Sequence, residues 1–81
     1  MIPTERQIRE GRHLAGMSQT ALAVGAGVGM ELVVRAELGD GLPMLTRRDS
    51  TALQTALEAA GVEFISATGG GAGVQWRKAG V

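Results

Sequence analysis

The sequence predicts a mainly helical domain that ends in a C-terminal β-hairpin. Three observations support this fold class. Up to Gly61, apolar residues recur at helical spacing between N-cap residues and glycines. After Gly61 the apolar period changes to two, which is typical of strands. The 81 residues can bury one small core but not two. We therefore expect a single domain over 1–81, with a helical part at about 4–61 and a hairpin at about 62–78.

The first helix is predicted at about 4–15. Thr4 is a favourable N-cap, and Gln7 stands three residues later, as in a capping box. Gly11 lies inside this helix, where glycine costs about 1 kcal/mol relative to alanine unless packing needs the space. Gly16 is a suitable C-terminal stop.

Two short helices are predicted next, at about 18–25 and 29–38. Ser18 is a favourable N-cap for the first of them. Gly27 can adopt the left-handed conformation that ends this helix. Two short helices joined by a tight turn that contains glycine are typical of a helix-turn-helix.

The fourth helix is predicted at about 46–60. Thr46 begins it, and Leu53 and Leu57 belong to one continuous apolar stripe at helical spacing. Gly61 ends the stripe.

The hairpin is predicted from two alternating runs at 62–65 and 74–77, on either side of a glycine-rich loop at 67–73. One interpretation is that Phe64 and Trp76 form a cross-strand pair that covers the fourth helix. The alternative is pairing between the hairpins of two protomers, because an isolated hairpin is only marginally stable in water. The expected dimer interface consists of Val62, Phe64, Val74 and Trp76.

Several segments together resemble the Cro/repressor-type, XRE-like helix-turn-helix family. They cover almost the whole chain and keep the family's order. The segment at 57–65 resembles the LEAAGVEFI-like segment of a small bacterial subgroup. The matching segments are QIR at 7–9, MSQTALA at 17–23, AGV at 26–28, RAELG at 35–39 and LEAAGVEFI at 57–65.

The resemblance implies a repressor-like helix-turn-helix bundle of four to five helices that binds double-stranded DNA as a homodimer. Its third helix would enter the major groove. Val28, Val33 and Ala36 match buried positions, and Glu37 matches a structural acid. The positions that match DNA contacts are Ser18 and Gln19 at the start of the second helix, Met30, Glu31, Leu32, Val34 and Arg35 on the outer face of the third, and Arg47 and Arg48 at the start of the fourth.

The outer face of the third helix departs from this family. Base readers carry hydrogen-bonding side chains there, whereas this chain has Met30, Leu32 and Val34. The eight basic and eight acidic residues also cancel, although DNA-binding domains are usually basic. The leading hypothesis is a small DNA-binding transcriptional regulator. The alternative is a protein–protein interaction module on the same scaffold, which would bind a transcription factor or RNA polymerase or act as an anti-repressor.

Two groups of basic residues, one on the first helix and one at the start of the fourth, have two interpretations each. On the first helix, Arg6, Arg9 and His13 share a face, which we interpret as solvated and balanced by Glu5 and Glu10; contact with phosphate is the alternative. For Arg47 and Arg48, phosphate contact and ion pairing with Asp40 or Asp49 both remain open.

The composition argues against catalysis, metals and membranes. The chain has no cysteine and one histidine, so we expect no metal and no cofactor. Ser18, Ser50 and Ser66 lack the neighbours of a catalytic nucleophile, so we expect no enzymatic activity. No apolar segment resembles a signal peptide or a membrane span, so we expect a cytoplasmic location without a membrane partner.

Overall fold

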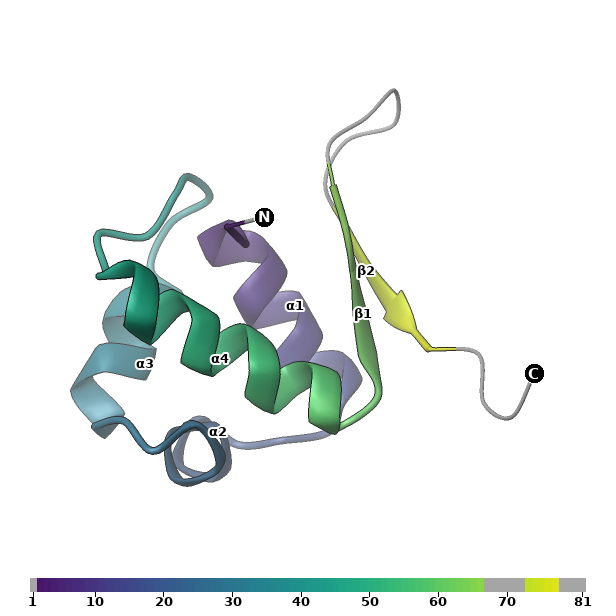
Figure 1. The fold of residues 1–81 in the computed structure, drawn as a ribbon, viewed down its shortest axis with the longest axis horizontal. Helices are drawn as coiled ribbons and strands as arrows, with labels where there is room; N and C mark the ends of the chain where they lie inside the picture. Colours follow the sequence, from purple (N-terminus) through teal and green to yellow (C-terminus); the bar gives the residue numbers. More distant parts are fainter. Residues whose placement is uncertain (1, 67–72, 78–81) are drawn as a thin grey trace.

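The computed structural model describes residues 2–66 and 73–77. These residues form a mainly helical fold with a two-stranded antiparallel hairpin at its C-terminal end, which confirms the expected fold class at this level (Figure 1). The described residues contain four helices, the lower of the two expected numbers. The elements are α1 (Glu5–Leu14), α2 (Gln19–Ala26), α3 (Met30–Ala36), α4 (Arg47–Ala59), β1 (Val62–Ile65) and β2 (Gly73–Trp76).

The predicted N-caps start three of the helices. The hydroxyl of Thr4 accepts a hydrogen bond from the Gln7 amide, and the Gln7 side chain accepts one from the Thr4 amide, which completes the capping box. The side chains of Ser18 and Thr46 accept from backbone amides in the first turns of α2 and α4. These bonds satisfy amides that have no partner within their own helix.

Helix α3 is shorter than predicted, since it ends at Ala36 and not near residue 38. The guanidinium of Arg9 explains this end. Its Nη1 donates to the carbonyl oxygens of Glu37 at 2.6 Å and Gly39 at 2.9 Å. Carbonyl groups that follow α3 are thus satisfied by a side chain from α1.

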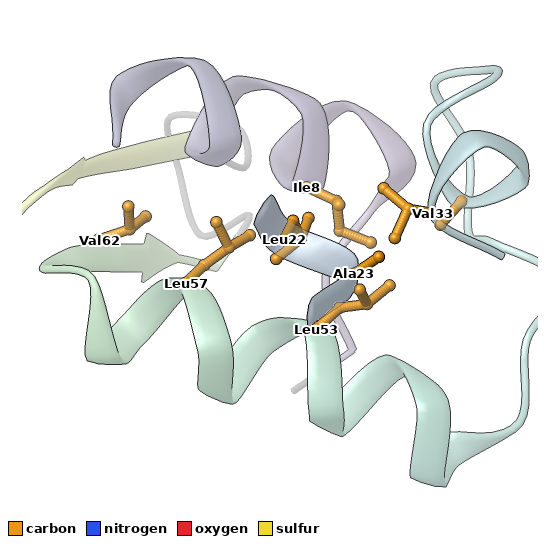
Figure 2. Close-up of a cluster of buried hydrophobic side chains, with 8 residues drawn as sticks. Ile8, Leu22, Ala23, Val33, Leu53, Leu57 and Val62 are labelled. Atoms are coloured by element: carbon orange, nitrogen blue, oxygen red, sulfur yellow. The ribbon is translucent and has the colours of Figure 1, made fainter. Parts of the chain in front are cut away.

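One apolar core joins all four helices to β1. Figure 2 shows side chains from each of these elements converging on one cluster. Gly11 lies on the face of α1 nearest the hairpin, where a Cβ atom would lie 3.3 Å from Val62 Cγ1 and 3.4 Å from Leu57 Cδ1. Packing therefore needs the space at Gly11. The fully buried or nearly buried apolar residues are Ile8, Leu22, Ala23, Val33, Ala36, Leu53, Leu57 and Val62.

The hairpin packs on α1 and α4, and this corrects two expectations about it. Trp76 lies opposite Val62, and Phe64 lies opposite Val74, so the two aromatic residues are not a direct cross-strand pair. Val62 is fully buried within its own protomer, and Phe64 and Val74 pack against the same core. The expectation that Val62 contacts a second copy is therefore wrong, because the helices already cover this face of the hairpin.

Two contacts fix the hairpin to the helices. Nε2 of the buried Gln7 donates to the carbonyl oxygens of Ile65 and Gly73, at the far end of the two strands. At the other end, Gly61 has a φ of +100°, and the Trp76 ring would lie only 3.0 Å from a Cβ atom there. The loop predicted at 67–73 lies outside the described residues except for Gly73.

Candidate nucleic-acid interface

Helices α2 and α3 follow one another directly and are joined by residues 27–29. Gly27 ends α2 in the left-handed conformation (φ +69°, ψ +33°), and its amide and that of Val28 bond back to carbonyls of α2. Gly29 is the N-cap of α3. The connection between the two helices is therefore the tight glycine-bearing turn predicted from the sequence.

The outer face of α3 carries two exposed apolar side chains and two exposed charges. Met30 and Val34 are 42% and 38% exposed, and Glu31 and Arg35 are also exposed. Leu32 differs from the expectation, since it is half-buried and packs against the core. Leu32 shares a face of α3 with the buried Ala36, because residues four positions apart lie on the same side of a helix. Leu32 is therefore not part of the outer face.

A buried ion pair holds the end of α3 against α1. Arg12 donates through Nε and Nη2 to the two oxygens of Glu37, at 2.8 and 2.9 Å. Both side chains are largely buried, with 12% and 4% of their surface exposed. Gln19 at the start of α2 also lies beside this carboxylate, with Nε2 at 3.4 Å from Oε1. Glu37 is thus a structural acid that joins the end of α1, the start of α2 and the end of α3.

Three arginines near α3 and α4 are exposed and have no acidic partner. They are Arg35 at the last turn of α3 and Arg47 and Arg48 in the first turn of α4. Among the described residues, which include all eight carboxylate side chains of the sequence, none lies within 4.0 Å of these guanidinium groups. Neither Arg47 nor Arg48 therefore pairs with Asp40 or Asp49, so the alternative interpretation of ion pairing is wrong.

All three arginines of α1 form ion pairs with carboxylates of the same chain. Arg6 pairs with Glu10 on the surface, and Arg12 pairs with Glu37 in the interior. Arg9 pairs with Asp40 at 3.0 Å, not with Glu5 or Glu10 as the sequence interpretation held. The first helix therefore offers few free positive charges, in contrast to the arginines of α3 and α4.

Sequence reasoning missed a further exposed group in the segment between α3 and α4. Leu38, Leu42 and Met44 are 74%, 64% and 92% exposed. The signal for Leu42 and Met44 was their occurrence in a stretch with glycine, aspartate and proline, where no helix or strand pattern could bury them; Leu38 stands at the predicted end of the third helix, just before this stretch. We call these three residues the loop surface.

Other features of the described residues are less suited to a site. A shallow hollow of about 540 Å³ lies between α1 and β2, and it is lined by Arg9, Glu10, His13, Leu14 and Val74. None of these side chains is a hydroxyl that could act as a nucleophile. Within 2–66 and 73–77, no group of three or more histidine or acidic side chains could hold a metal ion. No helix in the described part of the chain is long and apolar enough to cross a membrane.

No protein-family model matches the sequence, and no curated protein shows significant similarity to it. The resemblance to the XRE-like family therefore remains an expectation that rests on the sequence motifs alone.

Proposed function

We propose that this protein is a small transcriptional regulator that binds double-stranded DNA with α3 in the major groove. The observation that carries the proposal is the set of unpaired arginines. Among the described residues, Arg35, Arg47 and Arg48 have no acidic partner, whereas Arg6, Arg9 and Arg12 form ion pairs. Figure 1 shows α3 and the first turn of α4 toward the same end of the molecule, so one polyanion could contact both. A neutral chain can thus present positive charge locally.

The placement of Arg47 and Arg48 also supports phosphate contacts. They occupy the first turn of α4, where the partial positive charge of the helix dipole makes a cation unfavourable. The same dipole attracts an anion, so a phosphate between the helix start and the guanidinium groups would be stabilised by both. Ser18 provides a second exposed helix start at α2, and Gln19 stands beside it.

The outer face of α3 would give limited base discrimination. Met30 and Val34 can contact thymine methyl groups, Arg35 can donate to guanine or phosphate, and Glu31 can accept from the cytosine amine. Phosphate contacts position a protein on DNA but carry no sequence information directly. We therefore expect binding that depends mainly on the backbone, with a modest preference for sites rich in thymine.

Fluorescence anisotropy with a labelled duplex tests the proposal. Affinity should fall linearly on a logarithmic scale as salt rises, with a slope of about −0.9 for each phosphate contacted. A thymine-containing duplex should bind more tightly than a duplex of the same length made only of G·C pairs. Absence of binding to any duplex at about 50 mM salt, where electrostatic binding is strong, would exclude the proposed function.

A protein–protein interaction module on the same scaffold is a second candidate. The exposed apolar pair of Met30 and Val34 favours it, because base-reading helices usually present hydrogen-bonding groups at such positions. Another transcription factor or RNA polymerase would be the partner, and α3 would dock its apolar face into it. Contiguous exposed apolar residues often mark such interfaces.

Replacement of both apolar residues separates the two candidates. Met30→Gln with Val34→Gln should keep the fold, because both side chains are exposed. In a major groove the new amides gain base edges as partners, so affinity for DNA should be retained or increased. In a desolvated protein interface the same amides should cost about 1–3 kcal/mol of binding free energy each. Retained or increased DNA affinity thus supports the transcriptional regulator. Loss of binding to RNA polymerase, measured without DNA, supports the protein–protein interaction module.

A further inference from the structure

We propose that Met30, at the start of α3, is a site of oxidative modification that controls how the protein distinguishes DNA sequences. A hydroperoxide converts its thioether to the sulfoxide, and the modified side chain no longer contacts thymine methyl groups. The inference rests on the proposed function, because it concerns the face of α3 that is proposed to enter the major groove.

Methionine carries all the sulfur of this chain. The sequence has no cysteine and four methionines, so a reaction of peroxide with sulfur takes place at methionine. Within the described residues, Met17 is half-buried and packs against the core. Met44 is 92% exposed but belongs to the loop surface, on the segment between α3 and α4. Of the methionines that the structure describes, Met30 alone is exposed on the outer face of α3.

A hydroxyl group from α2 binds the sulfur of Met30. Thr20 Oγ1 donates to Met30 Sδ at 3.6 Å, and both side chains are exposed. The sulfur of a thioether is a weak acceptor, whereas a sulfoxide carries a polar oxygen on that sulfur. The Thr20 hydroxyl therefore gains a stronger acceptor when Met30 is oxidised. This bond stabilises the modified side chain on the surface that α2 and α3 share.

The modification is an oxygen-atom transfer with hydrogen peroxide or an organic hydroperoxide as the oxidant. A lone pair of Met30 Sδ attacks one oxygen of the peroxide and forms the S–O bond while the O–O bond breaks. The proton on the transferred oxygen passes to the leaving oxygen, which departs as water or as an alcohol. Sulfur is oxidised from thioether to sulfoxide, and the peroxide is reduced.

The sulfoxide changes what the outer face of α3 offers to a base pair. Met30 and Val34 lie four positions apart, so they form one apolar pair on the same side of the helix. Thymine presents a methyl group and a carbonyl oxygen in the major groove. A sulfoxide is an acceptor without a donor, so it binds neither of them. We therefore expect oxidation to remove the preference for thymine and to leave binding to the DNA backbone intact.

Fluorescence anisotropy of peroxide-treated protein with the thymine-containing and G·C duplexes tests the inference. Peptide mapping by mass spectrometry first measures the fraction of Met30 that has gained one oxygen. Oxidation should lower the affinity for the thymine-containing duplex about fourfold, as expected for the loss of one methyl-sized apolar contact. It should not lower the affinity for the G·C duplex. The salt slope should stay the same, since no phosphate contact is lost.

Two leucine variants identify the methionine that is responsible. Leucine keeps nearly the volume and the apolar character of methionine without an oxidisable sulfur. Met30→Leu should bind both duplexes as the untreated wild type does, and it should not respond to peroxide. Met44→Leu is the matched control, and it should keep the whole response because Met30 is unchanged in it.

Three outcomes would overturn the inference and leave the proposed function standing. The first is a DNA-binding chain in which Met30 stays unoxidised while Met44 is converted. The second is an oxidised chain that keeps the duplex preference of the untreated protein. The third is a peroxide effect that persists in Met30→Leu. Absence of binding by the untreated chain to either duplex would instead refute the proposed function, and this inference with it.

Discussion

The Arg12–Glu37 ion pair is the most buried of the three ion pairs among the described residues. It is nearly buried, both oxygens of Glu37 are engaged, and it links α1 to the end of α3. The sequence motifs marked Glu37 as a structural acid but did not identify its partner. Helical spacing places Arg9 and Arg12 on one face of the first helix, because they are three positions apart. Only the packing of α1 on the segment after α3 shows that both bind that segment.

Removal of one member of this pair should strongly destabilise the protein. Arg12→Ala leaves the buried Glu37 carboxylate without a charged partner, and the expected loss is about 3–5 kcal/mol of unfolding free energy. Denaturant titration followed by circular dichroism measures it. In the control, Arg12→Met with Glu37→Leu replaces both charges by apolar groups, and its stability should be close to that of the wild type. An equally unstable double variant would show that the loss comes from packing and not from the unpaired charge.

Leu32 and Val34 should respond in opposite ways to the same replacement. Leu32→Gln places an amide against the core and should cost about 1–3 kcal/mol of stability. Val34→Gln changes an exposed position and should stay within about 0.5 kcal/mol. Thermal melting of the two variants measures the contrast. Equal melting temperatures would contradict the orientation of α3.

At the scale of elements, the helices follow from local signals. The N-caps Thr4, Ser18 and Thr46 and the stop at Gly27 predicted where helices begin and end to within one or two residues. The end of α3 could not be predicted in this way. It depends on Arg9, which is distant in sequence and supplies hydrogen bonds to the carbonyl groups beyond the helix. The hairpin register was also out of reach, because it depends on which strand face the helices cover.

Replacement by alanine should have opposite effects at two glycines, one inside α2 and one at its C-terminal end. Gly27 has a φ of +69°, so Gly27→Ala should cost about 1–2 kcal/mol of stability. Gly25 lies inside α2. A Cβ atom at this position would lie 3.9 Å from the Cβ atom of Ala56, which is an ordinary van der Waals contact. Gly25→Ala should therefore stabilise the protein by up to about 1 kcal/mol through helix propensity. Urea unfolding of both variants measures the difference, and a destabilising Gly25→Ala would indicate that α2 packs more tightly on α4 than the structure shows.

At the scale of the whole molecule, composition alone does not predict how the charges are distributed. Equal numbers of acidic and basic residues suggested a surface without a preference for polyanions. The fold distributes these charges unevenly, because it pairs the arginines of α1 with Glu10, Asp40 and Glu37 and leaves those of α3 and α4 unpaired. Pairing between residues about 25 to 31 positions apart cannot be read from periodicity. The sequence motifs predicted which residues would contact DNA. Only the structure shows that the candidate arginines lack the ion pairs that the α1 arginines form.

The salt dependence of DNA binding by an arginine variant tests the central proposal most directly. Arg47→Ala with Arg48→Ala should weaken binding to a mixed-sequence duplex and reduce the magnitude of the salt slope by about 1.8, since two phosphate contacts of about 0.9 each are lost. Arg6→Ala is the matched control, because Arg6 is also an exposed arginine near a helix start but pairs with Glu10; its slope should equal that of the wild type. A double variant with the affinity and slope of the wild type would show that α4 does not lie at the DNA backbone, and would contradict the proposed interface.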